Sequence, residues 1–269
     1  MMDRHAVFID GGYVIAAGGL LTLNAKKRHL VGCDIEALIE AVVDLTSTTS
    51  GLPILRTYWY DGAYGGVPSF SQTLIADLPS VKLRLGRISQ GVQKGVDSLL
   101  VTDLMTLAQE RAVSAAFLMT GDEDIRPGVI ACQALGVRLT LIGVEGRNPN
   151  EFTQSATLLS EADGSLMLDQ AFLAPHFQRR SPLPREVDGA KIAASLGVGA
   201  TPEDYGEAFG RFWAANLTIF ELRRLDARRP RIPKPVDSML MLSFGGLVPS
   251  HSGSMLRAGF WKGIDAAHP

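Results

Sequence analysis

The first 170 residues alternate short apolar segments with segments of helical periodicity, and this alternation restricts the fold more than any other feature. Residues 5–10, 115–120 and 137–144 are largely apolar runs with the length of buried strands. Residues 55–61 are rich in β-forming side chains and end in an aspartate, which also predicts a strand. Residues 81–86 alternate apolar and basic side chains, as a strand with one exposed face does. Strands that alternate with helices are typical of a mostly parallel sheet with helices on both faces. We therefore expect an α/β fold built on about five strands.

Segments with apolar residues three and four positions apart connect the expected strands. The longest covers residues 96–112, and shorter ones cover residues 33–47, 70–78 and 125–136. Asp34 stands at the start of the first of these and is expected to cap it. These helices are expected to cover the faces of the sheet.

The composition changes near residue 175. Residues 175–186 contain three prolines and three arginines, which is typical of a linker or surface loop. Residues 187–265 contain further helical segments, one of them entered at Thr201-Pro202, and no clear strand. We therefore divide the chain into an α/β domain, residues 1–174, and a linker with a small helical region, residues 175–269.

Charge and motif counts exclude several classes of protein. The net charge of −2 provides no broad attraction to nucleic acid, so phosphate binding requires a local basic patch or a bound metal. The two cysteines, Cys33 and Cys132, form no CxxC pair, and no histidine lies in an HExxH motif. No GxGxxG follows an expected strand, which argues against a dinucleotide-binding enzyme.

The sequence also indicates a compartment. No apolar run approaches the roughly 20 residues that span a bilayer. The N-terminal segment lacks the charged-then-apolar pattern of a secretory signal. We therefore expect a cytoplasmic protein with no membrane partner.

Aspartates recur where the expected strands end, at Asp10, Asp122 and Asp124, and in the expected helix at 96–112, at Asp97 and Asp103. The carboxyl ends of parallel strands meet at one edge of a sheet, where ligands bind. Carboxylates gathered there repel one another and raise each other's pKa values. A divalent cation relieves that repulsion, and hard carboxylate oxygens favour Mg²⁺ or Mn²⁺. The pattern therefore predicts a metal site at this edge.

The spacing distinguishes Asp97 from Asp103 as candidate metal ligands. Asp97 and Asp103 are six residues apart, about 120° of rotation on an ideal helix, so they do not share a face. Asp97 is predicted to be a direct ligand, and Asp103 to be a ligand or to lie just behind one. Each aspartate alone has an ordinary explanation, because aspartate is common in turns and Asp124 can cap the helix at 125–136.

Basic and aromatic residues near these aspartates are candidates for RNA contacts. Those preceding Asp97 are Lys82, Arg84, Arg87 and Lys94, which either contact phosphates or form a solvated strand face. Tyr13 follows the first acidic turn and either stacks on a base or packs inside the protein. Residues 221–234 hold six basic residues against two acidic ones, so they either bind RNA or form a solvated loop.

Several motifs in order resemble the NYN domain, which belongs to the PIN-like nucleases and includes the LabA-like proteins. They are VFIDGGYV (7–14), YWYDGA (58–63), KGVDSLLVTDLMTLA (94–108), TGDEDIRPGVIACQALGVRLTLIG (120–143) and SATLLSEAD (155–163). The resemblance covers about residues 5–170. It implies a Rossmann-like fold, a Mg²⁺ or Mn²⁺ centre and cleavage of RNA.

The resemblance also implies roles for single residues. Asp10 matches the acidic residue after the first strand, and Asp97 matches the aspartate after a Lys-Gly pair. Asp122 and Asp124 match the (S/T)GDxD turn, with Thr120 in the hydroxyl position and in reach of RNA. Asp103 matches a further acidic position in the helix. Many relatives have an asparagine shortly after the first aspartate, where Gly12-Tyr13 stands here, a variant that resembles a LabA-like branch.

We expect a metal-dependent ribonuclease whose catalytic carboxylates are those of Asp10, Asp97, Asp122 and Asp124. The alternative is a catalytically weak NYN module that binds RNA or another partner in a regulatory role. A metal-dependent phosphatase fits less well, because the first strand is followed by DGG and not by a DxD turn. The helical region is expected to assist RNA binding or the formation of a homo-oligomer.

Overall fold

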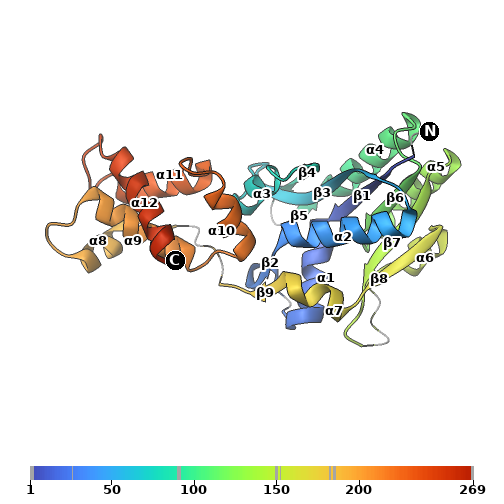
Figure 1. Cartoon of the computed structure of the whole chain (residues 1–269), viewed down its shortest axis with the longest axis horizontal. Helices are drawn as coiled ribbons and strands as arrows, with labels where there is room; N and C mark the ends of the chain where they lie inside the picture. Colours follow the sequence, from blue (N-terminus) through green and yellow to red (C-terminus); the bar gives the residue numbers. More distant parts are fainter. Residues whose placement is uncertain are drawn as a thin grey trace. The chain divides into compact units, whose positions relative to one another are not determined.

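The computed structural model describes residues 3–25, 27–89, 92–148, 151, 153–181, 183 and 186–267, except for the side chains of residues 89 and 92–94. The chain divides into two compact units, residues 1–179 and 180–269 (Figure 1). In the described part of the chain, no helix combines the length and apolar character needed to cross a membrane.

The first unit is built on a seven-stranded sheet of order β5-β4-β3-β1-β6-β7-β8 (Figure 1). Its strands are β1 (His5–Asp10), β3 (Ile54–Tyr64), β4 (Val81–Ser89), β5 (Val92–Lys94), β6 (Ala115–Met119), β7 (Arg138–Val144) and β8 (Gly164–Leu168). Six strands run parallel, and β5 pairs antiparallel with β4. The expected α/β fold is confirmed, and β1, β6 and β7 are parallel neighbours as predicted.

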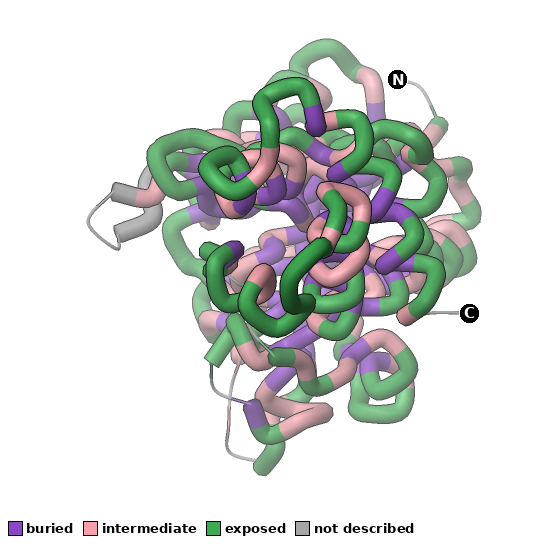
Figure 2. Tube along the Cα trace, turned by 90° about the vertical axis from the view of Figure 1, so that its left-hand side faces the viewer, coloured by how far each residue is buried: buried purple, intermediate pink, exposed green. Residues whose placement is uncertain are grey.

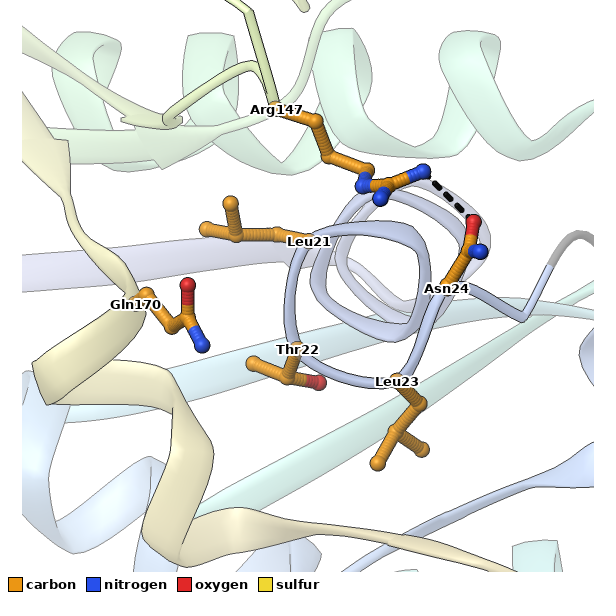
Figure 3. A pocket seen from close by; sticks show the side chains of 6 residues that line it. All are labelled: Leu21, Thr22, Leu23, Asn24, Arg147 and Gln170. Atoms are coloured by element: carbon orange, nitrogen blue, oxygen red, sulfur yellow. Dashed lines mark hydrogen bonds between the residues drawn. The ribbon is translucent and has the colours of Figure 1, made fainter.

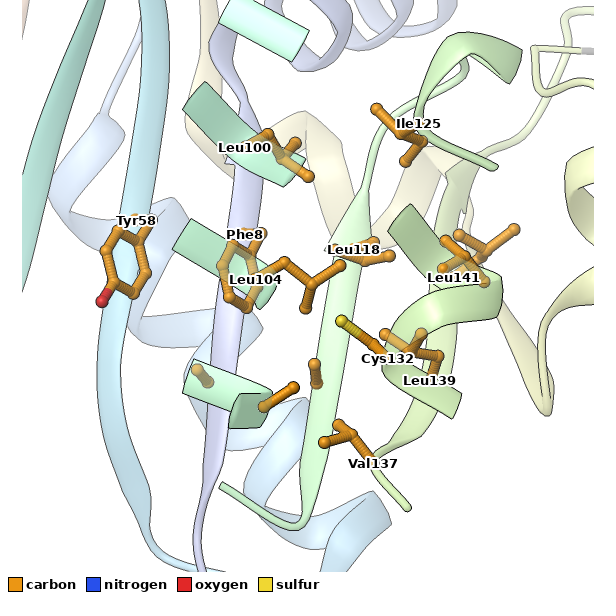
Figure 4. Packing of buried hydrophobic residues seen from close by; sticks show 14 of the residues in the cluster. Phe8, Tyr58, Leu100, Leu104, Leu118, Ile125, Cys132, Val137, Leu139 and Leu141 are labelled. Atoms are coloured by element: carbon orange, nitrogen blue, oxygen red, sulfur yellow. The ribbon is translucent and has the colours of Figure 1, made fainter. Parts of the chain in front are cut away.

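Helices cover both faces of this sheet because side chains of β1 alternate between the faces. Phe8 faces a core that includes Leu100, Leu104 and Cys132 from two of the helices (Figure 4). The helices of the unit are α1 (Gly11–Leu23), α2 (Ile35–Ser50), α3 (Phe70–Ile75), α4 (Val96–Gln109), α5 (Arg126–Ala134), α6 (Ala156–Glu161) and α7 (Gln170–Leu173). Helices α2, α4 and α5 lie where helical periodicity predicts them. Asp34 caps α2 by accepting a hydrogen bond from the backbone N–H of Ala37.

The first unit extends beyond the expected boundary at residue 174. Strand β9 (Phe177–Arg179) pairs antiparallel with β2 (Val31–Cys33), so part of the proline-rich stretch belongs to a strand. The Phe177 ring lies directly over Gly18 of α1, where a Cβ atom would stand 2.4 Å from the ring. This close approach attaches the end of the unit to α1.

The second unit is helical, as the sequence predicts. It contains α8 (Gly189–Leu196), α9 (Pro202–Ala214), α10 (Ile219–Asp226), α11 (Lys234–Phe244) and α12 (Gly253–Ala267). Thr201 caps α9 at the predicted start, through a capping box with Asp204. Phe209, Phe244 and Phe260 are fully buried within the unit. In both units buried positions recur along the helices, with exposed positions between them (Figure 2).

Candidate carboxylate site at the edge of the sheet

Asp10 ends the central strand and begins α1. Its Oδ1 accepts hydrogen bonds from the backbone N–H groups of Gly12, at 2.8 Å, and Tyr13, at 3.1 Å. A side chain at Gly11 would meet the Trp59 indole, since a Cβ atom there would lie 2.6 Å from Nε1. The DGG sequence therefore permits the turn that holds the Asp10 carboxylate at the carboxyl end of β1.

Electrostatic repulsion connects Asp10 to carboxylates on other elements. Burial raises the pKa of Asp10 above its usual range, repulsion from Asp97 and Asp61 raises it further, and the two backbone N–H groups oppose the shift. Burial also raises the pKa of Asp97, in the first turn of α4, and repulsion from Asp122 and Asp124 adds to it. Carboxylates from β1, α4 and the turn after β6 are therefore neighbours.

The turn after β6 presents Asp122 and Asp124 to solvent. The Asp122 backbone N–H donates to Thr120 Oγ1 at 3.2 Å, and Asp122 Oδ1 accepts from the Asp124 backbone N–H at 3.0 Å. Thr120 itself is only 1% exposed, so the expected RNA contact of Thr120 is not supported. Its hydroxyl shapes the acidic turn.

We name Asp10, Asp97, Asp122 and Asp124 the edge carboxylates. In the part of the chain that the structure describes, none of them is paired with a basic side chain. Among the same residues, no three metal-binding side chains are gathered closely enough to form a ligand set as they stand. The donor chemistry nevertheless fits a hard divalent cation, because unpaired carboxylates that repel one another are relieved by it.

Asp103 is held in a different way. It is buried, and both of its oxygens accept hydrogen bonds from Arg84, with Arg84 Nε at 2.7 Å from Oδ2. The Tyr60 hydroxyl donates to the same Oδ2 at 3.0 Å, and burial and the neighbouring carboxylate raise the pKa of Tyr60. Neither the metal-ligand role expected for Asp103 nor the phosphate contact expected for Arg84 is supported, because each already satisfies the other.

The other candidates for RNA contacts separate into exposed and packed residues. Lys82 and Arg87 are exposed on β4, and the Lys94 side chain lies outside the described residues. The Tyr13 hydroxyl donates to Thr153 Oγ1 at 3.1 Å and accepts from the Val144 backbone N–H at 3.0 Å. Tyr13 therefore packs against the end of β7 and the loop that holds Thr153, and base stacking by this ring is not supported.

At least one arginine of the basic segment at 221–234 is also paired within the protein. The Arg229 guanidinium pairs with Asp226 and Asp265 and lies over the Trp261 ring, 4.5 Å from its centre. Arg229 is therefore satisfied within the protein, whereas the segment as a whole was expected either to bind RNA or to form a solvated loop.

Asp61 is a site residue that the sequence reasoning missed. It lies one position beyond Tyr60, the register partner of Asp10, and it is 4% exposed. Its carboxylate accepts hydrogen bonds from Arg28 Nη2, Gln72 Nε2 and the Gly62 backbone N–H, at 2.7, 3.0 and 2.8 Å. The signal was present in the sequence, because the expected strand at 55–61 also ends in an aspartate.

A cavity of about 410 Å³ lies elsewhere, at the C-terminal end of α1 (Figure 3). It is lined by Leu21, Thr22, Leu23, Asn24, Arg147 and Gln170. Arg147 Nη1 donates to Asn24 Oδ1 at 2.5 Å across its rim. None of the predicted site residues lines this cavity, so it is separate from the carboxylate site.

Comparison with known proteins places this arrangement in a family. An uncharacterized protein of Sinorhizobium fredii, y4oD, is 42% identical to this chain over 140 residues. The aligned residues are 51% of this chain and 64% of y4oD, so the chain spans less than two thirds of the length of that relative. A crystal structure of a Vibrio parahaemolyticus protein of unknown function is similar with a TM-score of 0.42 and 16% identity, covering 62% of this chain and 94% of that one. The NYN domain model matches residues 4–166, from β1 into β8. The match spans more than half of the chain, which therefore belongs to the NYN domain family, within the PIN-like nuclease superfamily.

Proposed function

We propose that this protein is a metal-dependent ribonuclease that hydrolyses RNA phosphodiester bonds at the edge carboxylates. The observation that carries the proposal is the mutual repulsion of Asp97 with Asp10, Asp122 and Asp124 at the carboxyl edge of a parallel sheet. Bringing unpaired acidic groups together costs free energy in the protein alone. Such an arrangement is typical of a site whose charge balance includes a cation.

The edge carboxylates would hold Mg²⁺ or Mn²⁺, which when bound activates water and neutralises charge on the phosphodiester. The α1 backbone fixes the orientation of Asp10, and Thr120 fixes that of Asp122. An edge carboxylate accepts the proton that the attacking water loses. The Gly12-Tyr13 variant supports a place in the LabA-like branch of the family.

The second candidate is an NYN module that binds RNA without cleaving it. Two observations favour it: no three-ligand set is assembled among the described residues, and Tyr13 occupies the region of the family's asparagine with a packing role. Both candidates share a cytoplasmic RNA partner, and the helical unit would assist RNA binding or self-association in either. They differ in whether RNA is cut.

The test is incubation of the purified full chain with mixed single-stranded RNA in Mn²⁺, in Mg²⁺ and in excess chelator. Asp97→Asn and Asp122→Asn should each abolish cleavage. Asp44→Asn is the matched control, because Asp44 is an exposed aspartate on α2 outside the site. Cleavage by wild type in chelator, or by Asp122→Asn at the rate of Asp44→Asn, would overturn the proposal. RNA binding without cleavage would establish the second candidate.

A further inference from the structure

The Asp61 carboxylate is buried beside the carboxylate site. Three donors satisfy it, and one of them is a charged side chain, Arg28, whose Nη2 lies 2.7 Å from Oδ2. A second donor, Gln72 Nε2, also bonds the Gly62 carbonyl oxygen and so fixes the carboxylate to the strand. Asp61 is therefore a rigid acceptor, anchored to β3 next to Asp10.

Arg28 differs from Asp61 in its exposure. Its side chain is 46% exposed, whereas that of Asp61 is 6% exposed. Among the described residues, the Arg28 guanidinium donates one hydrogen bond, from Nη2 to the Asp61 carboxylate. An arginine presents five N–H donors, so most of this guanidinium remains able to bind another acceptor.

The pair lies beside the site, since Asp61 follows Tyr60, the register partner of Asp10. An ion pair carries no net charge, so the Arg28 guanidinium balances the carboxylate that holds it. The pair presents a planar cation, held at one nitrogen and open to solvent, next to a candidate nuclease centre. Arginine forks match phosphate oxygens in geometry and charge.

We propose that Arg28 binds a phosphate of the RNA backbone beside the edge carboxylates and that Asp61 is the positioning residue that holds it there. The inference rests on the proposed function for its substrate class, and it names a group that supplies local positive charge in a chain of net charge −2. Among the predicted basic residues whose side chains the structure describes, none has this position. Lys82 and Arg87 lie on β4, and Arg84 is used by Asp103.

Binding, and not cleavage, is the measurement that tests this. A fluorescein-labelled single-stranded RNA of mixed sequence is titrated with the full chain in excess chelator, and anisotropy is followed at several salt concentrations. Arg28→Ala should weaken binding about tenfold, the loss of a charge-assisted hydrogen bond. The slope of log affinity against log salt should fall in magnitude by about 0.7, the value for one phosphate on a single strand.

Arg28→Ala leaves Asp61 buried without its cation, which can destabilise the fold. The double variant Arg28→Ala/Asp61→Asn removes both charges and should bind RNA as weakly as the single variant. Arg28→Lys keeps the charge but not the fork, so it should keep the salt slope of wild type and lose part of the affinity. The matched control is Arg138→Ala, because Arg138 is exposed where β7 begins, at the opposite edge of the same sheet.

The outcomes are distinct. The proposal is supported if Arg28→Ala and the double variant lose affinity and slope while Arg138→Ala matches wild type. It is overturned if the double variant binds as Arg138→Ala does, or if wild type does not bind RNA in chelator. Wild type that binds RNA through Arg28 but never cleaves it would contradict the ribonuclease proposal and leave this inference standing.

Discussion

Two sets of acidic groups in the first unit differ in what balances their charge. Asp103 and Asp61 are buried, and each is paired with an arginine and bonded by a neutral side chain, Tyr60 or Gln72. The edge carboxylates are more exposed and repel one another. A buried carboxylate must be satisfied by the protein itself. The edge carboxylates are partly exposed and have no basic partner among the described residues, so they can bind a cation.

Because their charges are balanced differently, the two sets of carboxylates should respond differently to substitution. Loss of an edge carboxylate should affect activity and spare the fold, whereas loss of a paired carboxylate should affect the fold first.

Asp97→Asn is expected to have the largest effect, on cleavage. Asp97 repels three other edge carboxylates, so it is the member most directly surrounded by the set. Its loss should lower the rate of RNA cleavage in Mn²⁺ by more than about 100-fold, beyond the usual cost of losing a residue that supports a metal site. Initial rates on a labelled RNA measure it. A rate within a few-fold of wild type would remove Asp97 from the site.

Asp103→Asn should instead destabilise the protein. Breaking a buried ion pair costs about 3–5 kcal/mol, and the 34% exposure of the Arg84 side chain reduces this to about 2–3 kcal/mol. Urea unfolding followed by circular dichroism gives the free energy of unfolding. The folded fraction should still cleave RNA under conditions that favour folding. A stable but inactive Asp103→Asn protein would move Asp103 from the paired set to the edge set.

Divalent cations should stabilise the protein only through the edge carboxylates. Mn²⁺ at about 100 times its dissociation constant should raise the free energy of unfolding by about 2.7 kcal/mol. The shift in melting temperature should grow with Mn²⁺ concentration, disappear in Asp97→Asn/Asp122→Asn and persist in Asp103→Asn. If the double edge variant shows the same Mn²⁺ shift as wild type, the cation binds elsewhere and the comparison fails.

Sequence reasoning is sufficient for the strands at the centre of the sheet because their signal is local, but it does not predict β5 or β8. The apolar runs that form β1, β6 and β7 are short, continuous and separated by helical periodicity, and each lies at its predicted residues. The geometry of one helix was also informative. The 120° between Asp97 and Asp103 predicts that they diverge, and the structure places Asp103 against Arg84 while Asp97 joins the edge carboxylates.

Other features depend on packing that no local pattern contains. Helix α1 was not predicted, because residues 11–23 are apolar or small on every side and show no polar face. It forms between Trp59 and Phe177, which approach it so closely that Gly11 and Gly18 are required. The pairing of Asp103 with Arg84 joins α4 to β4, and only the packing of that helix on the sheet brings the two together.

Asp61 shows why a strand end read from sequence is misleading. The sequence places the end of the strand at 61, but β3 continues to Tyr64, because its pairing with β4 extends beyond the last pair with β1. That extension buries Asp61 along the strand, where it needs Arg28 and Gln72 as partners. The register between strands therefore decides whether an aspartate belongs to the edge set or the paired set, and sequence alone does not contain it.

The smallest expected effect is the most specific to the comparison. In excess chelator, Asp97→Asn removes a charge that Asp122 and Asp124 repel, so the free energy of unfolding should rise by up to about 1 kcal/mol. Asp44→Asn, an exposed control on α2, should stay within about 0.5 kcal/mol of wild type. Urea unfolding of the three proteins in chelator and again in Mn²⁺ measures the effect. In Mn²⁺, wild type should instead have the higher free energy of unfolding, because it gains the binding free energy that Asp97→Asn has lost. If Asp97→Asn is less stable than Asp44→Asn in chelator, the repulsion is not a cost in the metal-free protein. The contrast between the two sets of carboxylates would then need another explanation.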